Sequence, residues 1–281
     1  MQTRIIVDSS TDLMPRIKQQ CTVVPLTVRF GDEEYIDGVT INHKTFYEKL
    51  IECDELPSTS QASPDAFAQI FRQVADAGEQ AVVLTLSSKL SGTYQSACIA
   101  AMDYPDSIFV VDGLNVAIGT GVLAELAVSM AQAGADAATI AEELTRQREN
   151  VCVIAMLDTL EYLKKGGRIS KTVAFAGELL SIKPVAAVCD GEVALLGKAR
   201  GSRQANNLLV KEIEKAGGVD FTKPVLLGYT GLTDALLRKY ITDSAHLWEP
   251  LGTEPNCAPI GSVIGTHVGP GAVAAAFFKN T

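Results

Sequence analysis

The chain has 281 residues, of which 47% are hydrophobic and 20% are charged. This composition supplies a large core and excludes intrinsic disorder, and the length favours about two domains, because one domain usually takes about 100–200 residues. The 24 Lys and Arg residues against 33 Asp and Glu residues give a formal net charge of −9, which excludes a nonspecific nucleic-acid binder and disfavours strong binding to an anionic membrane.

Six cysteines are spread thinly along the chain, and none forms a C-x-x-C pair. Disulfide frameworks are typical of small secreted domains, so we expect reduced thiols in a cytoplasmic protein. The N-terminal residues have the pattern of a first strand rather than of a signal peptide. No apolar run reaches the roughly 18 residues that a membrane span needs.

Strand and helix patterns alternate through residues 1–150. In chain order we expect a strand at 4–7, a helix ending near 20, a strand at 23–30, a turn at Asp37-Gly38 and a helix capped by Asn42. A helix from Pro64 to about 74, a strand at 81–86, a helix from Thr93 to about 102, a strand at 108–111, and helices at 116–132 and 136–150 follow. This alternation is typical of βα units, so residues 1–150 are predicted to form a parallel α/β domain.

The pattern changes after about residue 150. We expect a strand at 151–157, a short helix at 158–165 that ends at Gly166-Gly167, and a hairpin of strands 182–188 and 193–198 around Asp190-Gly191. A helix capped by Ser202 and reaching about 216, a strand at 225–229, a helix at 233–241 and a strand at 260–266 follow. Hairpins mixed with helices predict an α+β domain with an antiparallel or mixed sheet over residues 151–281.

Hydroxyl side chains gather in three segments of the first domain, which are 9–11, 58–60 and 87–93. Loops at the carboxyl ends of parallel strands converge on the ligand crevice, and Ser91-Gly92-Thr93 opens a helix whose free N–H groups favour an anion. The loops contain Lys89 but no arginine or Walker pattern, which favours a carboxylate over a phosphate. The alternative is that each hydroxyl only caps a helix or stabilises a turn.

A glycine-rich segment at 265–272 surrounds His267, one of three histidines. This histidine either shares a proton with a bound carboxylate or is a turn residue. No histidine or cysteine cluster has metal-ligand spacing, so we expect no metal. Two basic segments, 164–170 with Arg168 and 198–203 with Arg200 and Arg203, are either ligand and partner contacts or solvated surface.

Several enzyme templates do not fit the chain. The G-x-S-x-G nucleophile elbow is absent, and the G-x-G-x-x-A match at 119–124 falls inside an expected helix that packs with small residues. Asp8 follows the first strand but lacks a second aspartate two positions on, which favours a loop-bracing role. We therefore expect a binding protein without catalytic activity of its own.

Together these segments resemble the DegV family of bacterial fatty-acid-binding proteins. The segments that carry the resemblance occur in the family's order and cover nearly the whole chain; they are 7–13, 24–26, 57–61, 86–94, 157–170, 197–200 and 266–271. The resemblance implies a parallel α/β domain and an α+β domain that enclose one long-chain fatty acid, of C16–C18 length, in a tunnel. It also implies that the protein is the lipid-carrying subunit of a fatty acid kinase, whose separate ATP-binding subunit phosphorylates the carboxyl group.

The resemblance also implies roles for individual residues. The residues expected at the carboxylate are Thr59, Ser60, Ser91, Gly92, Arg168 and His267, and those expected to face the kinase or a membrane are Arg200 and Arg203. The segment 201–204 is less basic than the family pattern at this place. We expect a monomer without cofactors that contacts membranes transiently and does not bind nucleic acid.

Two other functions remain open from the residues alone. One is an enzyme that acts on a small phosphorylated or hydroxylated metabolite, resembling dihydroxyacetone-kinase-type folds. The other is a regulatory protein whose lipid occupancy is the signal.

Overall fold

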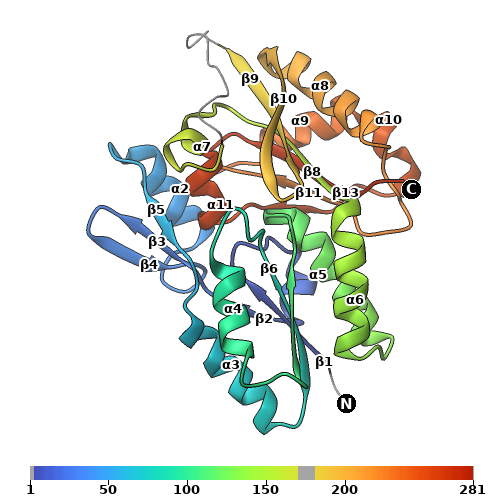
Figure 1. Cartoon of the computed structure of the whole chain (residues 1–281). Helices are drawn as coiled ribbons and strands as arrows, with labels where there is room; N and C mark the ends of the chain where they lie inside the picture. Colours follow the sequence, from blue (N-terminus) through green and yellow to red (C-terminus); the bar gives the residue numbers. More distant parts are fainter. Residues whose placement is uncertain (1–2, 170–180, 281) are drawn as a thin grey trace.

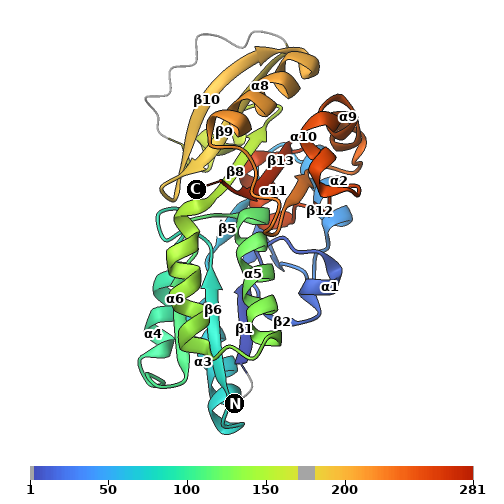
Figure 2. The ribbon, with the colours of Figure 1, turned by 90° about the vertical axis from the view of Figure 1, so that its right-hand side faces the viewer.

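The computed structural model describes residues 3–169 and 181–280. Residues up to 150, the first half, contain a parallel sheet in the order β2-β1-β6-β7, formed by β1 (Thr3–Asp8), β2 (Cys21–Val24), β6 (Gln80–Thr85) and β7 (Ile108–Asp112). Helices cover both of its faces (Figures 1 and 2); they are α3 (Pro64–Asp76), α4 (Thr93–Ala101), α5 (Ala117–Gln132) and α6 (Ala137–Gln147). The predicted parallel α/β architecture is confirmed.

The alternation of side chains along β1 explains this layering. Ile5 and Val7 pack with residues of α5 and α6, whereas Ile6 packs with residues of α3 and α4. Successive strand residues point to opposite faces, so a strand that is apolar throughout needs cover on both sides. The short glycine-rich match at 119–124 lies within α5, where added Cβ atoms would collide with Val153 at Gly119 and with the Asp12 carbonyl at Gly121. These glycines allow close helix packing.

A small antiparallel sheet with the order β4-β3-β5 lies beside the parallel sheet. It consists of β3 (Thr27–Phe30), β4 (Glu33–Ile36) and β5 (Ser58–Ser60) and is accompanied by α1 (Pro15–Lys18) and α2 (His43–Glu52). The predicted single strand at 23–30 was wrong: it is interrupted after Val24, and Pro25 has no N–H for a continuous ladder. The Asn42 cap is confirmed, because Asn42 and Thr45 form a reciprocal capping box.

Residues from 151 onward, the second half, contain a six-stranded sheet in the order β10-β9-β8-β13-β11-β12. Its strands are β8 (Val151–Met156), β9 (Ile182–Cys189), β10 (Glu192–Arg200), β11 (Leu226–Tyr229), β12 (Cys257–Pro259) and β13 (Val273–Phe278). Neighbours are antiparallel except β11 and β12, so the predicted mixed sheet is confirmed. The described helices of this half are α7 (Glu161–Lys165), α8 (Gly201–Lys215), α9 (Ala235–Asp243), α10 (Ala245–Trp248), α11 (Ser262–Val268) and the 3-10 turn η2 (Glu249–Leu251); another 3-10 turn, η1 (Arg148–Asn150), ends the first half.

Further differences from the predicted local structure occur elsewhere in the chain. The expected strand at 260–266 is mostly the helix α11, and the strand β13 was not predicted. A short apolar run does not distinguish a buried strand from a helix, and β13 contains three alanines, which are depleted in strands. Ser202 does not cap α8, because the helix already begins at Gly201 with Arg200 at the cap position, and the first helix spans only Pro15–Lys18.

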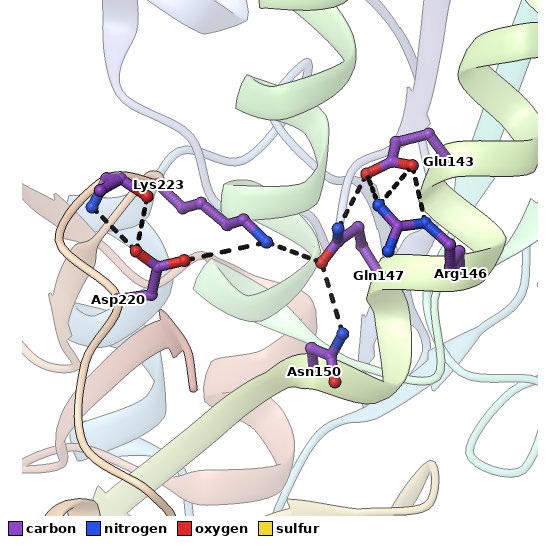
Figure 3. A network of polar contacts seen from close by, with 7 residues as sticks. Glu143, Arg146, Gln147, Asn150, Asp220 and Lys223 are labelled. Atoms are coloured by element: carbon purple, nitrogen blue, oxygen red, sulfur yellow. Dashed lines mark hydrogen bonds and ion pairs between the residues drawn. The ribbon is translucent and has the colours of Figure 1, made fainter. Parts of the chain in front are cut away.

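The two halves share a core and a polar network where the chain passes from one to the other. Residues of β8 and β13 pack in the same apolar cluster as α5. Beside it, Lys223 Nζ donates to Gln147 Oε1 at 3.0 Å, and Gln147 Nε2 donates to Glu143 Oε1 at 2.8 Å (Figure 3). Strands before and after residue 150 belong to different sheets; the domain boundary there stays a prediction.

Candidate functional site

A cavity of about 330 Å³ lies at the carboxyl end of the parallel sheet. Strand order reverses between β1 and β6, and the segment that follows β6 provides part of the cavity wall. Parallel sheets bind ligands at this switch point, and the volume is typical of a small-molecule site. The lining residues are Leu26, Thr59, Ser60, Gln61, Leu86, Leu90, Ser91, Gly92, Val116, Leu163, Arg168, Val193, Val263, Ile264, His267 and Val268.

The structure brings together all six residues that were predicted at the carboxylate. They come from four separate segments: β5, the loop before α4, the turn after α7, and α11. The sequence reasoning did not single out Gln61, although it belongs to the polar loop at 57–61, nor the apolar residues of the wall. The hydroxyl segment 9–11 does not line this cavity; Ser9 Oγ instead accepts a bond from Leu26 N, and Ser10 bonds to Asp8.

The most separated pair in the site is Thr59 and His267, which are 208 residues apart in sequence. Their Oγ1 and Nε2 atoms lie 2.9 Å apart, while Nδ1 of the imidazole is buried and has no hydrogen-bond partner among the described residues. Thr59 lies in β5, where it pairs with Val28, and this pairing holds its side chain at the cavity wall. An added Cβ on Gly166 would collide with the imidazole, so a glycine is required beside it.

Burial and the nearby Arg168 charge lower the pKa of His267 from 6.5 to about 4, so the ring is neutral at pH 7. A neutral imidazole carries one proton, and a buried N–H without an acceptor is rarer than a buried bare nitrogen. We therefore assign the proton to Nε2, which donates to Thr59 Oγ1. This assignment leaves the hydroxyl hydrogen of Thr59 available to donate into the cavity.

Arg168 places a positive charge at the same cavity. Its Nε donates to the carbonyl oxygen of Leu90 at 3.2 Å, and its Nη1 donates to that of Gly166 at 2.7 Å. Within the described part of the chain no carboxylate forms an ion pair with this guanidinium. The two carbonyl bonds hold the side chain in place, and no carboxylate among residues 3–169 and 181–280 neutralises its charge, which suits an anionic ligand.

Ser91 and Gly92 form the turn that leads into α4. Ser91 Oγ lies 2.9 Å from Thr93 Oγ1 and also accepts a bond from Thr93 N at 3.3 Å. Gly92 is at the cap position, and an added Cβ would collide with the Gln61 side chain, whose Nε2 donates to Ser96 Oγ at 2.9 Å. The start of α4 therefore faces the cavity with a hydroxyl and the positive end of a helix dipole.

Asp8 holds the beginning of this loop, as the loop-bracing interpretation expected. Its carboxylate accepts bonds from Leu86 N at 2.7 Å and from Ser10 N at 2.9 Å. The side chain is fully buried, and this burial raises its pKa from 3.8 to about 6. Asp8 therefore links the end of β1 to the segment that carries Ser91.

A second, smaller cavity of about 60 Å³ adjoins the first and lies between the two halves. The two cavities share the side chains of Val116, Leu163, Val193, Ile264 and Val268. The smaller cavity is lined only by apolar residues, among them five small alanines at 155, 186, 187, 272 and 274 and one at 117 that begins α5. Hydrogen-bond donors at one end and an apolar recess at the other suit an amphiphile with an anionic head.

Arg200 and Arg203 do not line either cavity. Arg200 ends β10 and its backbone N–H donates to Gln204 Oε1 at 3.3 Å, while Arg203 is exposed in the first turn of α8. Their partner-binding role stays a prediction. Across residues 3–169 and 181–280, no helix is long and apolar enough to cross a membrane, and no acidic, histidine or cysteine cluster fits a metal ion.

Comparison with known proteins gives a consistent match along the chain. A DegV-family structure from Thermus thermophilus, described by its fatty acid binding, is 30% identical and covers 99% of this chain and 100% of its own, with a TM-score of 0.85. A stearic acid-binding protein from Eubacterium ventriosum is 26% identical over 99% and 98% of the two chains, with a TM-score of 0.84. The fatty acid kinase B3 protein of Streptococcus pneumoniae, loaded with linoleic acid, is 23% identical over the full length of both chains and shares the fold with a TM-score of 0.86.

A family model covers almost the whole sequence. The model described as "Uncharacterised protein, DegV family" matches residues 2–280. The resemblance noted in the sequence is thereby confirmed, and the chain belongs to the DegV family.

Proposed function

We propose that this protein binds one long-chain fatty acid, with the carboxylate at Thr59, Ser91 and His267 and the acyl chain directed to the apolar recess. The observation that carries the proposal is the polarity of the joined cavities: Gly92 and all five polar residues predicted for the carboxylate line the larger one, and only apolar side chains line the smaller. Fatty acids bound by the T. thermophilus and E. ventriosum relatives support the same ligand class.

The polar end supplies orientation. Thr59 Oγ1 accepts a hydrogen bond from His267 Nε2, so its own hydroxyl hydrogen is free for a carboxylate oxygen, and Ser91 offers a second hydroxyl. The charge of Arg168, which forms no ion pair with the carboxylates that the structure describes, compensates the ligand's negative charge. Hydrogen bonds to a charged group contribute about 1.5–3 kcal/mol each when the group is desolvated.

The apolar end supplies affinity. Each buried methylene contributes about 0.8 kcal/mol, so about 14 methylenes contribute roughly 11 kcal/mol before the costs of binding. The small alanine side chains on β8, β9 and β13 leave the space between the halves in which an acyl chain would lie.

The proposal extends to a role in acyl-phosphate formation. The carboxylate would be held at the polar end, and a separate ATP-binding kinase subunit would phosphorylate it, with Arg200 and Arg203 as docking residues. The fold shared with the fatty acid kinase B3 protein supports this extension. On this proposal the chain is a non-catalytic, monomeric, cytoplasmic subunit.

Native mass spectrometry of the purified protein tests the proposal, followed by solvent extraction to identify the ligand. The expected result is one stoichiometric adduct with the mass of a C16–C18 acid, and a weaker adduct in Ser91→Ala. Ser63→Ala is a matched control, because Ser63 only caps α3 outside the cavity. An empty protein that also fails to take up added oleate or palmitate would overturn the proposal in favour of an enzyme on a small metabolite.

A further inference from the structure

Helix α11 belongs to the second half of the chain but begins among side chains of the first half. Gly261 N donates to Asp12 Oδ1 at 2.8 Å, and Tyr47 Oη donates to the carbonyl oxygen of Ile260 at 3.1 Å. Ser262 Oγ donates to Asp37 Oδ1. Three consecutive residues are therefore held by three different segments: the loop after β1, the turn after β4, and α2.

These three contacts are buried and do not belong to the fatty-acid cavity. Asp12 and Asp37 are 7% and 8% exposed, and Tyr47 is 0% exposed. None of the three lines the larger cavity or its apolar extension. Burying carboxyl groups is unfavourable and raises the pKa of both aspartates, so hydrophobic stability alone does not explain their presence.

The body of α11 is also pressed against the first half. It contacts α2, β3 and β5 as well as α7. An added Cβ on Gly265 would lie 2.7 Å from the Phe46 ring, so α11 and α2 meet at a distance that only glycine permits. A short helix held at its first residues and along one side has little freedom to tilt or rotate.

The helix carries the imidazole of the proposed site at its other end. His267 has one described side-chain hydrogen bond, to Thr59, and its Nδ1 has no partner among the residues that the structure describes, so the ring position depends on the backbone of α11. An α-helix rises 1.5 Å per residue, so Gly261, where the helix is held, lies about 9 Å from His267 along the helix axis. The helix also brings Val263, Ile264 and Val268 to the cavity wall.

We infer that Asp12, Asp37 and Tyr47 are positioning residues, which hold the start of α11 so that His267 meets Thr59 at hydrogen-bond distance. Their importance for ligand binding rests on the proposed function, whereas their effect on His267 does not. Loss of one of these contacts lets α11 shift, lengthens the bond between Thr59 and His267, and admits water to the ring.

The test compares variants that each change one side chain. Tyr47→Phe removes a single oxygen atom, and Asp12→Leu removes the acceptor for Gly261 N. Asp12→Asn is the conservative variant, because it retains the acceptor Oδ1, and Oδ2 has no partner within the described residues. Tyr240→Phe is a matched control, since Tyr240 is equally buried in the core of the second half, away from α11.

The primary readout is a ¹⁵N NMR titration of the histidine side chains, with His267 assigned by loss of its signals in His267→Gln. In the native protein and in Asp12→Asn and Tyr240→Phe, the pKa of His267 stays near 4. In Tyr47→Phe and Asp12→Leu it rises toward 6.5, and the affinity for oleate falls about tenfold, the effect of about one lost hydrogen bond.

An unchanged His267 titration in Tyr47→Phe and Asp12→Leu would overturn the inference. If Asp12→Leu does not fold, Tyr47→Phe decides the question alone, because its circular dichroism and melting curve verify the fold. A protein that takes up no fatty acid would overturn the proposed function, but the NMR comparison would still decide whether these residues position His267.

Discussion

The polar and apolar ends of the cavity are built in different ways. At the polar end, Thr59, Ser91, Arg168 and His267 come from four separate segments, and side-chain hydrogen bonds fix their polar groups one by one. At the apolar end, alanines on β8, β9 and β13 are held by the sheet ladders. The polar end therefore depends on individual hydrogen-bonding atoms, and the apolar end depends on the volume of its side chains. Substitutions at the two ends should therefore change different properties of binding.

The largest expected effect is on the pH dependence of folding stability, because the polar end contains His267, whose pKa is shifted, whereas the apolar end contains no titrating group. The pKa of His267 lies near 4 in the folded chain against 6.5 when unfolded, so the unfolded chain binds more protons between these values and stability falls as pH falls through this window. The expected loss from pH 6.5 to pH 4 is on the order of 3 kcal/mol.

Urea unfolding at several pH values checks this loss, with His267→Gln as the reference. Asp8 acts in the opposite direction, because its folded pKa of about 6 lies above 3.8 and its contribution to stability declines as pH rises through this interval. Asp8 is present in both proteins and cancels in the comparison. Parallel stability curves for the two proteins would contradict a buried neutral imidazole.

Filling the apolar end should change which chain length is preferred. Ala274→Leu places a larger side chain in the apolar recess, where Ala274 is 3% exposed. Excluding about three methylenes costs roughly 2.4 kcal/mol, so the affinity for a C18 acid should fall about 50-fold while that for a C12 acid changes little.

Competition between acids of different length measures this preference. Ala275→Leu serves as the control, because Ala275 faces the opposite core beside α8 and α9; it should lower the melting temperature without altering the preference. Equal losses for C12 and C18 acids in Ala274→Leu would show that the recess does not hold the end of the chain.

A single hydroxyl at the polar end should change affinity without changing the preferred length. Thr59→Val and Ser91→Ala each remove one donor while leaving the apolar recess intact, so affinity should fall about tenfold for every acid. Isothermal titration calorimetry with C12, C16 and C18 acids measures the ratio of native to variant affinity for each acid. A loss confined to one chain length would contradict the assignment of these hydroxyls to the carboxylate.

The smallest effect on lipid binding is expected outside both ends. Arg200→Ala and Arg203→Ala should leave fatty acid affinity unchanged, because neither residue lines the cavities. If these residues dock a kinase subunit, the charge-removing variants should slow acyl-phosphate formation in a reconstituted assay, and more strongly at low ionic strength. Lipid affinity that falls together with the phosphorylation rate would contradict this separation.

Local patterns predicted much of the fold because they act over a few residues. The strands predicted at 4–7, 81–86 and 108–111, the Asn42 cap and the turn at Asp190-Gly191 all occur where expected. The strand predicted at 260–266 was wrong because the apolar residues of this segment fit the period of a strand as well as that of a helix. Contacts with Asp12 and α2 favour the helix. Tertiary contacts override local preference where a segment is short and buried.

The sequence by itself determined which residue types were available for a carboxylate and that Ser91 and Gly92 follow a strand of a parallel sheet; Thr59 and Ser60, expected in a loop of the same kind, lie instead in β5 of the antiparallel sheet. Only the tertiary structure decided which hydroxyls line the cavity, since Ser9 and Ser10 brace loops while Thr59 and Ser91 face inward. It also decided that His267 meets Thr59 across 208 residues and that alanines leave a recess between the halves. Hydrogen bonding within a turn is encoded locally, whereas convergence of distant segments depends on how the sheets and helices pack.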